Sequence, residues 1–396
     1  MNPTLCSIKR PRILFVDHTG TLGGAELSLV DLATAYRGSS QVLLFEDGPL
    51  RERLAAAGVE VMIIPVPSAL LGVRSKDRLS SIRSIPALWQ AAYLTAKLSR
   101  DYDLVHANSQ KAFIVAALAS LWDGTPVIWH LRDILTASHY SQINRRVAVW
   151  LANKCARRVF VNSLATGSAF VAAGGQSELI SVVYNGISPD PFTLYGNYAA
   201  EEIRSQLGLD FLCQAPVVGI FSRLAPWKGQ HIVLEALQHL PDVHVLMVGE
   251  ALFGEDEYVA HLKAQSMALQ LTERVHWLGF RTDIPQLMAA CDIIVHASTE
   301  PEPFGRVIVE GQLSQRPVIA VAAGGALELI EDGLTGWLIP ANNAPALAAA
   351  IMELLSRPDT AKALAQQGCV RAHQRFTLEV SLSSFDQNLQ ALWSVR

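Results

Sequence analysis

Hydrophobic positions along the chain follow two alternating patterns. Short runs of β-branched and other apolar residues are separated by longer stretches in which apolar residues recur every three or four positions. The first pattern predicts buried strands, and the second predicts amphipathic helices. Strands and helices that alternate in this way are typical of parallel sheets built from βαβ units. The sequence therefore predicts an α/β fold.

The alternation runs through one half of the chain and then begins again in the other. In the first half, strands are expected at Ile13–Val16, Val42–Phe45, Val61–Ile64, Leu104–His106, Val127–His130, Val159–Val161 and Ile180–Tyr184, with helices that include Ala25–Tyr36 and Ser141–Cys155. In the second half, strands are expected at Val217–Phe221, Val243–Val248, Val275–Leu278, Ile293–His296, Val318–Val321 and Gly336–Ile339, with a helix near Gly229–His239. A segment rich in Pro, Gly and Asn, residues 185–197, predicts a linker between the halves.

Two Rossmann-like domains follow from this repeat, residues 1–187 and residues 188–376. A chain of 396 residues is also too long for one ordinary core. Ligands of such sheets bind beyond the carboxyl ends of the strands, so two facing domains would place a site in the cleft between them.

The composition narrows the function classes. Half of the residues are hydrophobic and 17% are charged, which is typical of a folded globular chain. No apolar run reaches the roughly 18 residues of a spanning helix, and the N-terminus lacks a secretory pattern, so we expect a cytoplasmic protein. Neither the histidines nor the cysteines show metal-ligand spacing, and we expect no metal. The cysteines are Cys6, Cys155, Cys213, Cys291 and Cys369.

Charge is distributed unevenly. The net charge of −4 combines about +5 in residues 1–190 with about −9 in the remainder. A basic first half indicates contact with an anionic membrane or another polyanion; an ordinary solvated surface is the alternative. Basic residues gather on what we interpret as one helix: Arg145, Arg146, Lys154, Arg157 and Arg158.

The segment Glu302-Pro-Phe-Gly, followed by Glu310, carries two carboxylates at the start of a helix. At a rise of 1.5 Å per residue they are separated by about 8 to 12 Å. That span is too long for a shared proton, but it suits the sugar and ribose hydroxyls at the two ends of a nucleotide sugar. Backbone amides of Phe304, Gly305 and Arg306 would face the phosphates at the helix N-terminus.

Arg223 and Lys228 lie on the loop that follows the first strand of the second half. Two cations at the carboxyl end of such a strand are suited to neutralising a departing diphosphate. In the first half, Gly23 and Gly24 precede a helix and allow a ligand to approach the backbone. His130 ends a strand and would be placed to hydrogen-bond a hydroxyl.

Asp101-Tyr-Asp103 has the DxD pattern that can hold a metal beside a nucleotide sugar. It precedes a strand and would therefore lie at the amino edge of the sheet, away from bound ligands. We reject it as a metal site. No P-loop, nucleophile elbow or nucleic-acid module is present either.

Taken together, these motifs resemble family 4 of the retaining GT-B glycosyltransferases (glycosyl transferases group 1), which includes glycogen synthase-like and sucrose synthase-like enzymes. The resemblance covers nearly the whole chain, from Gly23 to the last helix. It departs mildly at Gly311-Gln312, where the family usually has a small apolar pair. It implies the GT-B fold, with residues 377–396 and their helix, about Leu378–Trp393, crossing back to the first domain.

The resemblance also implies a role for each matching residue. Arg223 and Lys228 would bind the diphosphate, Glu302 the donor sugar and Glu310 the ribose. Phe304, Gly305 and Arg306 would contribute backbone amides, Arg281 would hold the base edge, and His130 would lie near the reacting centre. Transfer would proceed at the front face with retention, without a metal and without a protein nucleophile.

The function expected from these features is hexosyl transfer from a nucleotide sugar. UDP-glucose is the first choice of donor because it is frequent in the family; GDP-mannose and UDP-N-acetylglucosamine stay open. The acceptor would be a glycan or a lipid-linked sugar, with peripheral contact at the inner face of an anionic membrane. A nucleotide-sugar epimerase and a non-catalytic sugar-binding module are the alternatives.

Overall fold

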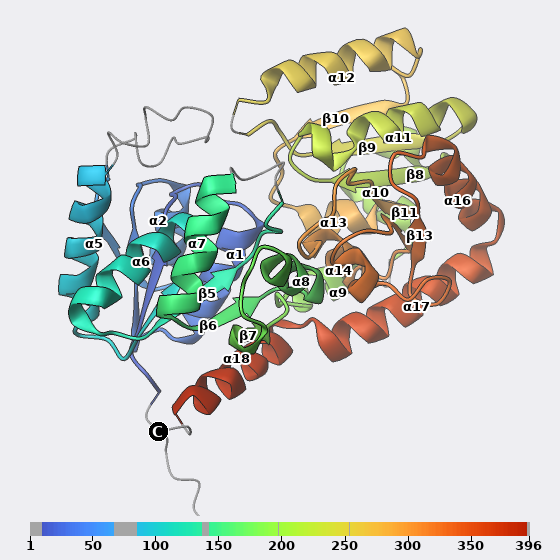
Figure 1. Cartoon of the computed structure of the whole chain (residues 1–396). Helices are drawn as coiled ribbons and strands as arrows, with labels where there is room; N and C mark the ends of the chain where they lie inside the picture. Colours follow the sequence, from blue (N-terminus) through green and yellow to red (C-terminus); the bar gives the residue numbers. More distant parts are fainter. Residues whose placement is uncertain (1–9, 67–84, 137–141, 197, 253, 394–396) are drawn as a thin grey trace, which may run out of the picture. The chain divides into compact units, whose positions relative to one another are not determined.

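The computed structural model describes residues 10–66, 85–136, 142–196, 198–252 and 254–393. The chain divides into two compact units (Figure 1). Unit 1 comprises Met1–Tyr184 and Leu382–Arg396, and unit 2 comprises Asn185–Ser381. Each unit is an α/β domain built on its own parallel sheet.

Unit 1 contains, among its described residues, a parallel sheet in the order β3-β2-β1-β4-β5-β6-β7. The strands are β1 Ile13–Asp17, β2 Ser40–Leu44, β3 Glu60–Ile63, β4 Leu104–Ala107, β5 Val127–Leu131, β6 Ala156–Val161 and β7 Ile180–Val182. Every residue of the central strands β1, β4 and β5 is buried. A parallel strand covered on both faces needs such a continuous apolar run, and this explains why short unbroken runs mark the strands in the sequence.

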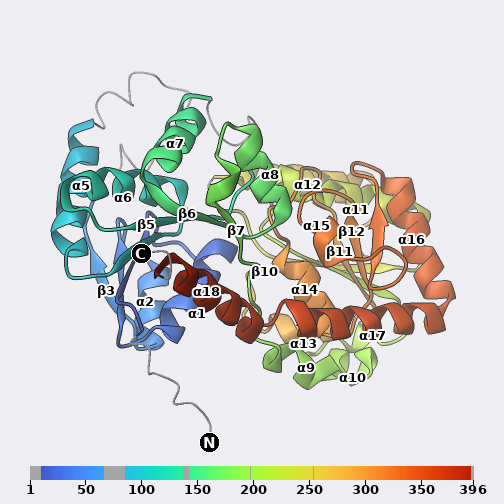
Figure 2. The same ribbon diagram turned by 60° about the horizontal axis from the view of Figure 1, so that its bottom comes forward.

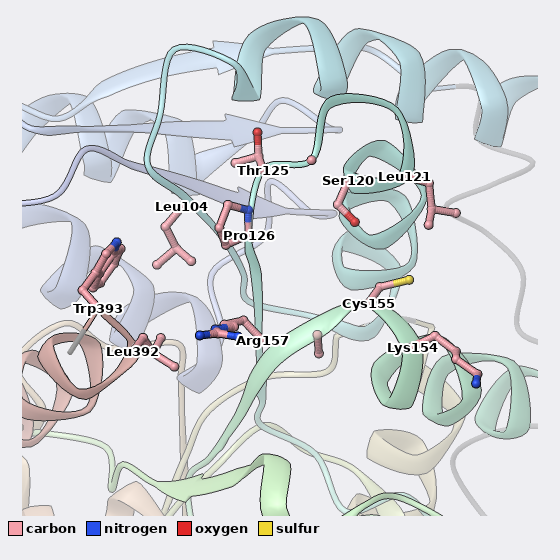
Figure 3. Close-up of a pocket in the computed structure, with 12 residues that line it drawn as sticks. Leu104, Ser120, Leu121, Thr125, Pro126, Lys154, Cys155, Arg157, Leu392 and Trp393 are labelled. Atoms are coloured by element: carbon pink, nitrogen blue, oxygen red, sulfur yellow. The ribbon is translucent and has the colours of Figure 1, made fainter. Parts of the chain in front are cut away.

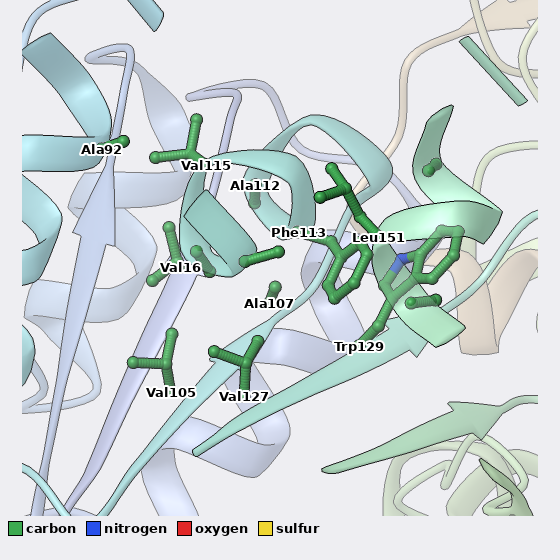
Figure 4. Packing of buried hydrophobic residues seen from close by; sticks show 14 of the residues in the cluster. Val16, Ala92, Val105, Ala107, Ala112, Phe113, Val115, Val127, Trp129 and Leu151 are labelled. Carbon is green, nitrogen blue, oxygen red and sulfur yellow. The ribbon is translucent and has the colours of Figure 1, made fainter. Parts of the chain in front are cut away.

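Helices cover both faces of this sheet. They are α1 Gly24–Ala35, α2 Pro49–Ala56, α5 Ile85–Ser99, α6 Gln110–Asp123, α7 Gln142–Cys155, α8 Leu164–Ala172 and α18 Leu378–Trp393. Residues of α5, α6, α7 and α8 form the core on one face, where the Phe113 ring stacks on Trp129 with centroids 4.6 Å apart (Figure 4). On the other face, α1, α2 and the end of α18 form a second core, and Figure 2 shows α18 beside α1 and α2.

Local signals fix the ends of these helices. The Ser109 hydroxyl accepts a hydrogen bond from the Ala112 amide and so caps the start of α6. Gly124 ends that helix in the left-handed region, with φ +74°. Helix α6 therefore begins directly after strand β4 and returns the chain to the amino edge of the sheet, where β5 starts.

Unit 2 repeats the design with the order β10-β9-β8-β11-β12-β13 among its described residues. The strands are β8 Val217–Phe221, β9 His244–Val248, β10 Val275–Gly279, β11 Ile293–His296, β12 Val318–Val321 and β13 Trp337–Ile339. The helices are α9 Asp190–Gly196, α10 Ala200–Gln206, α11 Gln230–Ala236, α12 Asp256–Ala268, α13 Ile284–Ala289, α14 Arg306–Leu313, α15 Ala326–Leu329, α16 Ala344–Ser356 and α17 Pro358–Arg375. The core on one face of this sheet is formed by α11, α12 and α16 with the strands.

All the predicted strands are confirmed, with ends that shift by up to three residues. The expected helix Ser141–Cys155 is confirmed from Gln142, and Ser141 lies outside the described residues. One interpretation was wrong. Arg157 and Arg158 lie on strand β6, so the five basic residues do not share one helix. No glycine or proline separates α7 from β6, and the turn from helix to strand at Cys155 leaves no mark in the sequence.

Candidate active site

The site in unit 2 begins with the topology of its sheet. Strands β8 and β11 are neighbours, yet the chain after β8 continues to one side and the chain after β11 to the other. Ligands of open α/β sheets bind at such a switch point, beyond the carboxyl ends of the strands. The loops that follow β8 and β11 meet there, and these are the two loops that carry the motifs Arg223–Lys228 and Glu302–Gly305.

Backbone contacts hold the two loops together. Gly229 follows the 3-10 turn Pro226–Lys228 with φ +74°, and a Cβ at this position would lie 2.0 Å from the Ala297 carbonyl oxygen. The Thr299 amide donates a 2.8 Å hydrogen bond to the Trp227 carbonyl. Only a glycine permits this close approach. The packing of the two loops therefore explains why a glycine directly follows Lys228.

Lys228 and Glu302 form an ion pair at the centre of the site. The Lys228 Nζ lies 2.6 Å from Glu302 Oε2, and both side chains are largely buried, with exposed fractions of 14% and 13%. Ser298 Oγ and His296 Nε2 also contact Oε2, at 3.1 Å and 3.3 Å. No described residue is hydrogen-bonded to the other oxygen, Oε1. Because all three contacts fall on one oxygen, the second remains available to a ligand hydroxyl.

Opposing effects set the protonation of this pair. Burial raises the pKa of Glu302, but the charge of Lys228 and the hydrogen bond from His296 outweigh it and hold the pKa well below its ordinary value. Burial lowers the pKa of Lys228, and the nearby Glu302 carboxylate offsets part of this effect. Glu302 is therefore an ionised acceptor at neutral pH, in a fixed orientation.

The Trp227 ring lies close to both cations of this loop. The Lys228 Nζ is 3.9 Å from the Trp227 ring centroid, and the Arg223 guanidinium carbon is 5.3 Å from it. Cation–π contacts of this kind orient long basic side chains. Arg223 and Lys228 therefore both lie near the Trp227 ring, and their role toward a diphosphate stays a prediction.

The glycine pair after β12 supports the Glu302 loop from behind. Gly324, with φ +60°, pairs with Glu302, and a Cβ at Gly324 would lie 2.3 Å from the Glu302 carbonyl oxygen. The Gly325 amide donates a 2.8 Å hydrogen bond to that same carbonyl. Because the Gly325 amide already donates to Glu302, Gly324 and Gly325 act on the site by positioning Glu302.

Helix α14 carries the remaining residues of the motif. Gly305 precedes it in the left-handed region, with φ +100°, and the Phe304 ring is buried against Phe376. Arg306 lies 3.5 Å from Glu310, one turn further along. Glu302 thus lies on the loop just before α14, and Glu310 lies within α14.

Gln312 departs from the family pattern and has a structural contact of its own. It is buried, and its amide nitrogen donates to the carbonyls of Leu329 and Thr335. The polar side chain thus ties α14 to the loop before β13, on the side of the helix that faces the core.

Arg281 follows β10, the edge strand of the sheet. Its guanidinium makes a bidentate pair with Asp283, with nitrogen–oxygen distances of 2.8 and 2.5 Å. This hydrogen bond, with the Asp283 charge, raises the pKa of Arg281. The side chain is more exposed than Lys228 or Glu302. The structure places it at the carboxyl edge of the sheet, but no described contact joins it to the Lys228–Glu302 pair.

In unit 1, His130 is enclosed. Only 1% of it is exposed, and its Nδ1 lies 3.1 Å from His106 Nε2 and 3.3 Å from an Arg132 nitrogen. Burial, with the charge of Arg132, lowers the pKa of His130 well below its ordinary value. His130 is thus neutral and belongs to a histidine pair, which sequence reasoning missed because β4 and β5 become neighbours only in the sheet. Its role near a reacting centre stays a prediction.

A polar network occupies the switch point of the unit 1 sheet, between β1 and β4. Asp17 is fully buried and accepts hydrogen bonds of 2.6 Å from the Asn108 side chain and from the His18 amide. His18 Nδ1 lies 2.8 Å from Ser109 Oγ, and the Arg132 Nε donates to Asn108 Oδ1 at 2.6 Å. The sequence signal for this network is a charged or amide residue at the end of an apolar strand, as with Asp17 and Asn108.

Gly23 and Gly24 lie at the start of α1, next to this network. A Cβ at Gly23 would lie 2.7 Å from a carboxyl oxygen of Glu26, so that carboxyl folds over the first turn. Burial, with the charge of Asp17, raises the pKa of Glu26 to about 8. Gly23 therefore leaves room for an acidic side chain of the helix that follows it, and the contact of Gly23 and Gly24 with a donor stays a prediction.

A cavity of about 570 Å³ lies at the opposite edge of the unit 1 sheet (Figure 3). Its lining includes Leu104 and Pro126 near the amino ends of β4 and β5, and Lys154 and Arg157 near the end of α7. Parallel sheets bind ligands at the carboxyl edge, so this cavity is not part of the candidate site. Asp103, of the DxD segment, lies at the same amino edge, where it accepts a hydrogen bond from the Arg12 amide.

The described part of the chain contains no group of three or more His, Cys, Asp or Glu side chains arranged to hold a metal ion. It also contains no helix long and apolar enough to cross a membrane.

Comparison with known proteins adds the family. Residues 210–370 match the model of the glycosyl transferases group 1, and residues 23–186 match that of the glycosyl transferase 4-like domain. Spore coat protein SA of Bacillus subtilis is 27% identical over 308 residues, which are 72% of this chain and 79% of that protein. A D-inositol 3-phosphate glycosyltransferase of Mycobacterium sp. (strain JLS) is 35% identical over 205 residues, but the match spans only 45% of its length.

Solved structures extend the likeness to both units. HepE from Anabaena, whose structure was solved in complex with UDP-glucose, is 40% identical, with a TM-score of 0.86. The match covers 96% of this chain and 100% of that one. Sucrose-phosphate synthase from Thermosynechococcus elongatus shares the fold, with a TM-score of 0.80 at 20% identity. Given this identity over a whole solved relative, and family models that match both halves, the chain belongs to the group 1 glycosyltransferases and has their GT-B fold.

Proposed function

We propose that this glycosyltransferase transfers glucose from UDP-glucose, with retention of configuration and without a metal, to a glycan or a lipid-linked sugar in the cytoplasm. The observation that carries the proposal is the buried Lys228–Glu302 pair at the switch point of unit 2. The choice of donor is supported by HepE, which shares 40% of its residues with this chain and was crystallised with UDP-glucose.

Lys228 and Arg223 would bind the diphosphate. An ammonium group has three N–H donors, and Glu302 uses one of those of Lys228. The others can reach phosphate oxygens while the ion pair stays in place. As negative charge develops on the leaving diphosphate, two preorganised cations stabilise it without the reorganisation that water would need. These cations supply the charge that a divalent metal supplies in other transferases.

Glu302 would orient the donor sugar through Oε1, the carboxylate oxygen that no described residue contacts. Ionised Glu302 can only accept hydrogen bonds, so it selects sugar hydroxyls and repels the diphosphate. Glu310 would bind the ribose, and Arg281 the base edge. The amides of Phe304, Gly305 and Arg306, at the start of α14, would face the phosphates.

The acceptor would bind at the carboxyl edge of the unit 1 sheet. His18 is a part-exposed member of the polar network there, and its Nδ1 lies against the buried Asp17 and against Ser109. An imidazole held in this way presents its other nitrogen in a fixed direction to an incoming hydroxyl. Gly23 and Gly24, beside this network, would let the ligand approach the backbone, and His130 would lie near the reacting centre.

Donor hydrolysis tests the reaction type without knowledge of the acceptor, because water replaces the acceptor hydroxyl. UDP-glucose carries an α-linked glucose, so retention yields α-glucose first, and proton NMR distinguishes it from the β anomer before they equilibrate. We expect the α anomer, with the same rate in the presence of EDTA. First formation of β-glucose contradicts retention, and loss of turnover in EDTA contradicts metal independence. Conversion of the donor to another UDP-sugar without release of UDP indicates an epimerase.

A further inference from the structure

Helix α7 carries apolar residues on the side that faces away from the core. Ile143 and Trp150 are 59% and 61% exposed, and Val147 is 43% exposed. At about 100° per residue these three positions fall within about 60° of one another on the helix surface. The buried residues of α7, Ala148, Val149, Leu151 and Ala152, lie on the opposite side. A solvated helix normally presents polar residues there, so this outward apolar stripe needs an explanation.

Basic residues accompany the stripe. Arg146 and Lys154 are exposed on the same side of the helix, and Arg145 is also basic, whereas α7 contains no acidic residue. The helix therefore carries a formal charge of +3 from three cations. Trp150 is the bulkiest member of the stripe, and tryptophan is enriched at the boundary between lipid and water.

Further aromatic rings are exposed on α5 and α6, which belong to the same helical layer as α7 (Figure 1). Trp89 and Tyr93 of α5 lie near Trp122 of α6, with ring centroids 5.2 and 6.4 Å from it. All three residues are at least 46% exposed. This side of unit 1 thus presents several amphipathic rings to its surroundings.

We propose that the outer face of α7, formed by Ile143, Arg146, Val147, Trp150 and Lys154, docks on an anionic lipid bilayer. This docking surface depends on the proposed function in one respect only: its purpose would be access to a lipid-linked acceptor. An apolar stripe edged by cations and free of carboxylates has the composition of helices that lie in the plane of a membrane surface. Three apolar side chains on one helix are fewer than the 20 to 30 residues that a stable protein interface needs on each side.

The two kinds of contact contribute differently. Burial of a large apolar side chain is worth about ten- to hundredfold in partitioning. Each cation near an anionic surface contributes about fivefold, and salt weakens this contribution. Binding should therefore require both the apolar stripe and an anionic lipid, and it should weaken as the salt concentration rises.

Vesicle sedimentation of the full-length protein tests the proposal. One set of vesicles consists of phosphatidylcholine with about 30 to 50% phosphatidylglycerol, which gives the surface a negative potential. The other set consists of pure phosphatidylcholine. We expect binding to the anionic vesicles only, reduced about tenfold or more by Trp150→Ala and about 25-fold by the double variant Arg146→Gln, Lys154→Gln.

Matched controls separate the stripe from general surface effects. Met267→Ala removes an apolar side chain on α12 of unit 2 that is 69% exposed, and Lys97→Gln with Arg100→Gln removes two exposed cations from unit 1. We expect these variants to bind as the unmodified protein does. Equal loss in the controls and in the α7 variants overturns the proposal, as does vesicle binding that survives Trp150→Ala.

Two measurements on the same preparations distinguish other outcomes. Sedimentation without lipid that shows an oligomer lost in Trp150→Ala assigns the stripe to a second copy of the chain and overturns the membrane proposal. Titration with UDP reports on the donor site. UDP binding that persists in Trp150→Ala shows that the variant is folded, so its loss of vesicle binding then supports the docking surface. Vesicle binding by a protein that does not bind UDP refutes the proposed function while it leaves the docking surface standing.

Discussion

Replacement of Lys228 by methionine tests how the site holds its charges. The substitution keeps the volume of the side chain but leaves Glu302 buried with no ammonium at 2.6 Å. Removal of one partner of a buried pair costs about 3 to 5 kcal/mol. The matched control is Arg357→Met, which removes an ion pair of the same 2.6 Å length at the end of helix α16, where Arg357 is 64% exposed and pairs with Glu353. That exposed pair should be worth less than about 1 kcal/mol.

The pH dependence of this loss is the sharper prediction. In the unmodified protein the pKa of Glu302 is lowered, so the pair contributes fully above the unfolded-state value of about 4.3 and is lost only as the pH falls through the lowered pKa. In Lys228→Met, burial raises the pKa of Glu302 instead. The folded variant then keeps its proton while the unfolded chain ionises, and this costs up to about 1.36 kcal/mol per pH unit above 4.3. The cost grows by up to about 2.7 kcal/mol between pH 5 and pH 7.

Denaturant unfolding at pH 5, 6 and 7 measures this growth. As the pH rises, the free energy of unfolding of Lys228→Met should decrease relative to that of the unmodified protein. For Arg357→Met, the difference in free energy of unfolding from the unmodified protein should stay constant over the same range. In the double variant Lys228→Met, Glu302→Gln, the pH dependence should disappear because no carboxyl remains to be protonated. If Lys228→Met loses the same amount of unfolding free energy at pH 5 and at pH 7, the reasoning is refuted.

Three further predictions follow from the contacts of single residues. Gly324→Ala places a Cβ 2.3 Å from the Glu302 carbonyl at a φ of +60°, so calorimetry should show a larger loss of affinity for UDP-glucose than for UDP, and equal losses would contradict it. Glu302→Gln should slow donor hydrolysis at least about tenfold while UDP affinity changes by less than about twofold, since the carboxylate contacts the sugar in our proposal; unchanged hydrolysis removes Glu302 from the chemistry. Burial raises the pKa of Glu26 to about 8, so the folded chain holds a proton that the unfolded chain releases, and stability should fall between pH 5 and pH 8. Glu26→Gln lacks this fall. The free energy of unfolding of Glu26→Gln, minus that of the unmodified protein, should therefore increase from pH 5 to pH 8, and a difference that is the same at both pH values contradicts the prediction.

The strands of both units were predictable because their physical signal is strong. Strands β8, β11 and β12 have the bounds that their short, mostly β-branched runs predict, since strands covered on both faces have few polar positions to blur the ends. The boundary between α7 and β6 was not predictable. The chain passes from helix to strand at Cys155 with no glycine or proline, so Arg157 and Arg158 extended the helical pattern by one turn.

The site could be predicted as a set of residues but not as a set of contacts. Arg223, Lys228 and Glu302 stand out because they are charged residues on the loops that follow apolar strands. That Lys228 pairs with Glu302 depends on the adjacency of β8 and β11, which are more than 70 residues apart in the sequence. The pairing of His106 with His130 depends in the same way on β4 and β5. Local propensity carries no information on which strands become neighbours, and so these contacts require the structure.

The most direct test of the central claim is a calorimetric titration of the full-length protein with UDP in the presence of EDTA, repeated with GDP and with Lys228→Ala. A donor site built on the cations of unit 2 predicts that UDP binds without a metal, that GDP binds more weakly, and that Lys228→Ala loses most of the affinity. GDP preference would keep the transferase but overturn the choice of donor. No binding of either nucleotide by the folded protein, or equal binding by Lys228→Ala, would contradict the donor site itself.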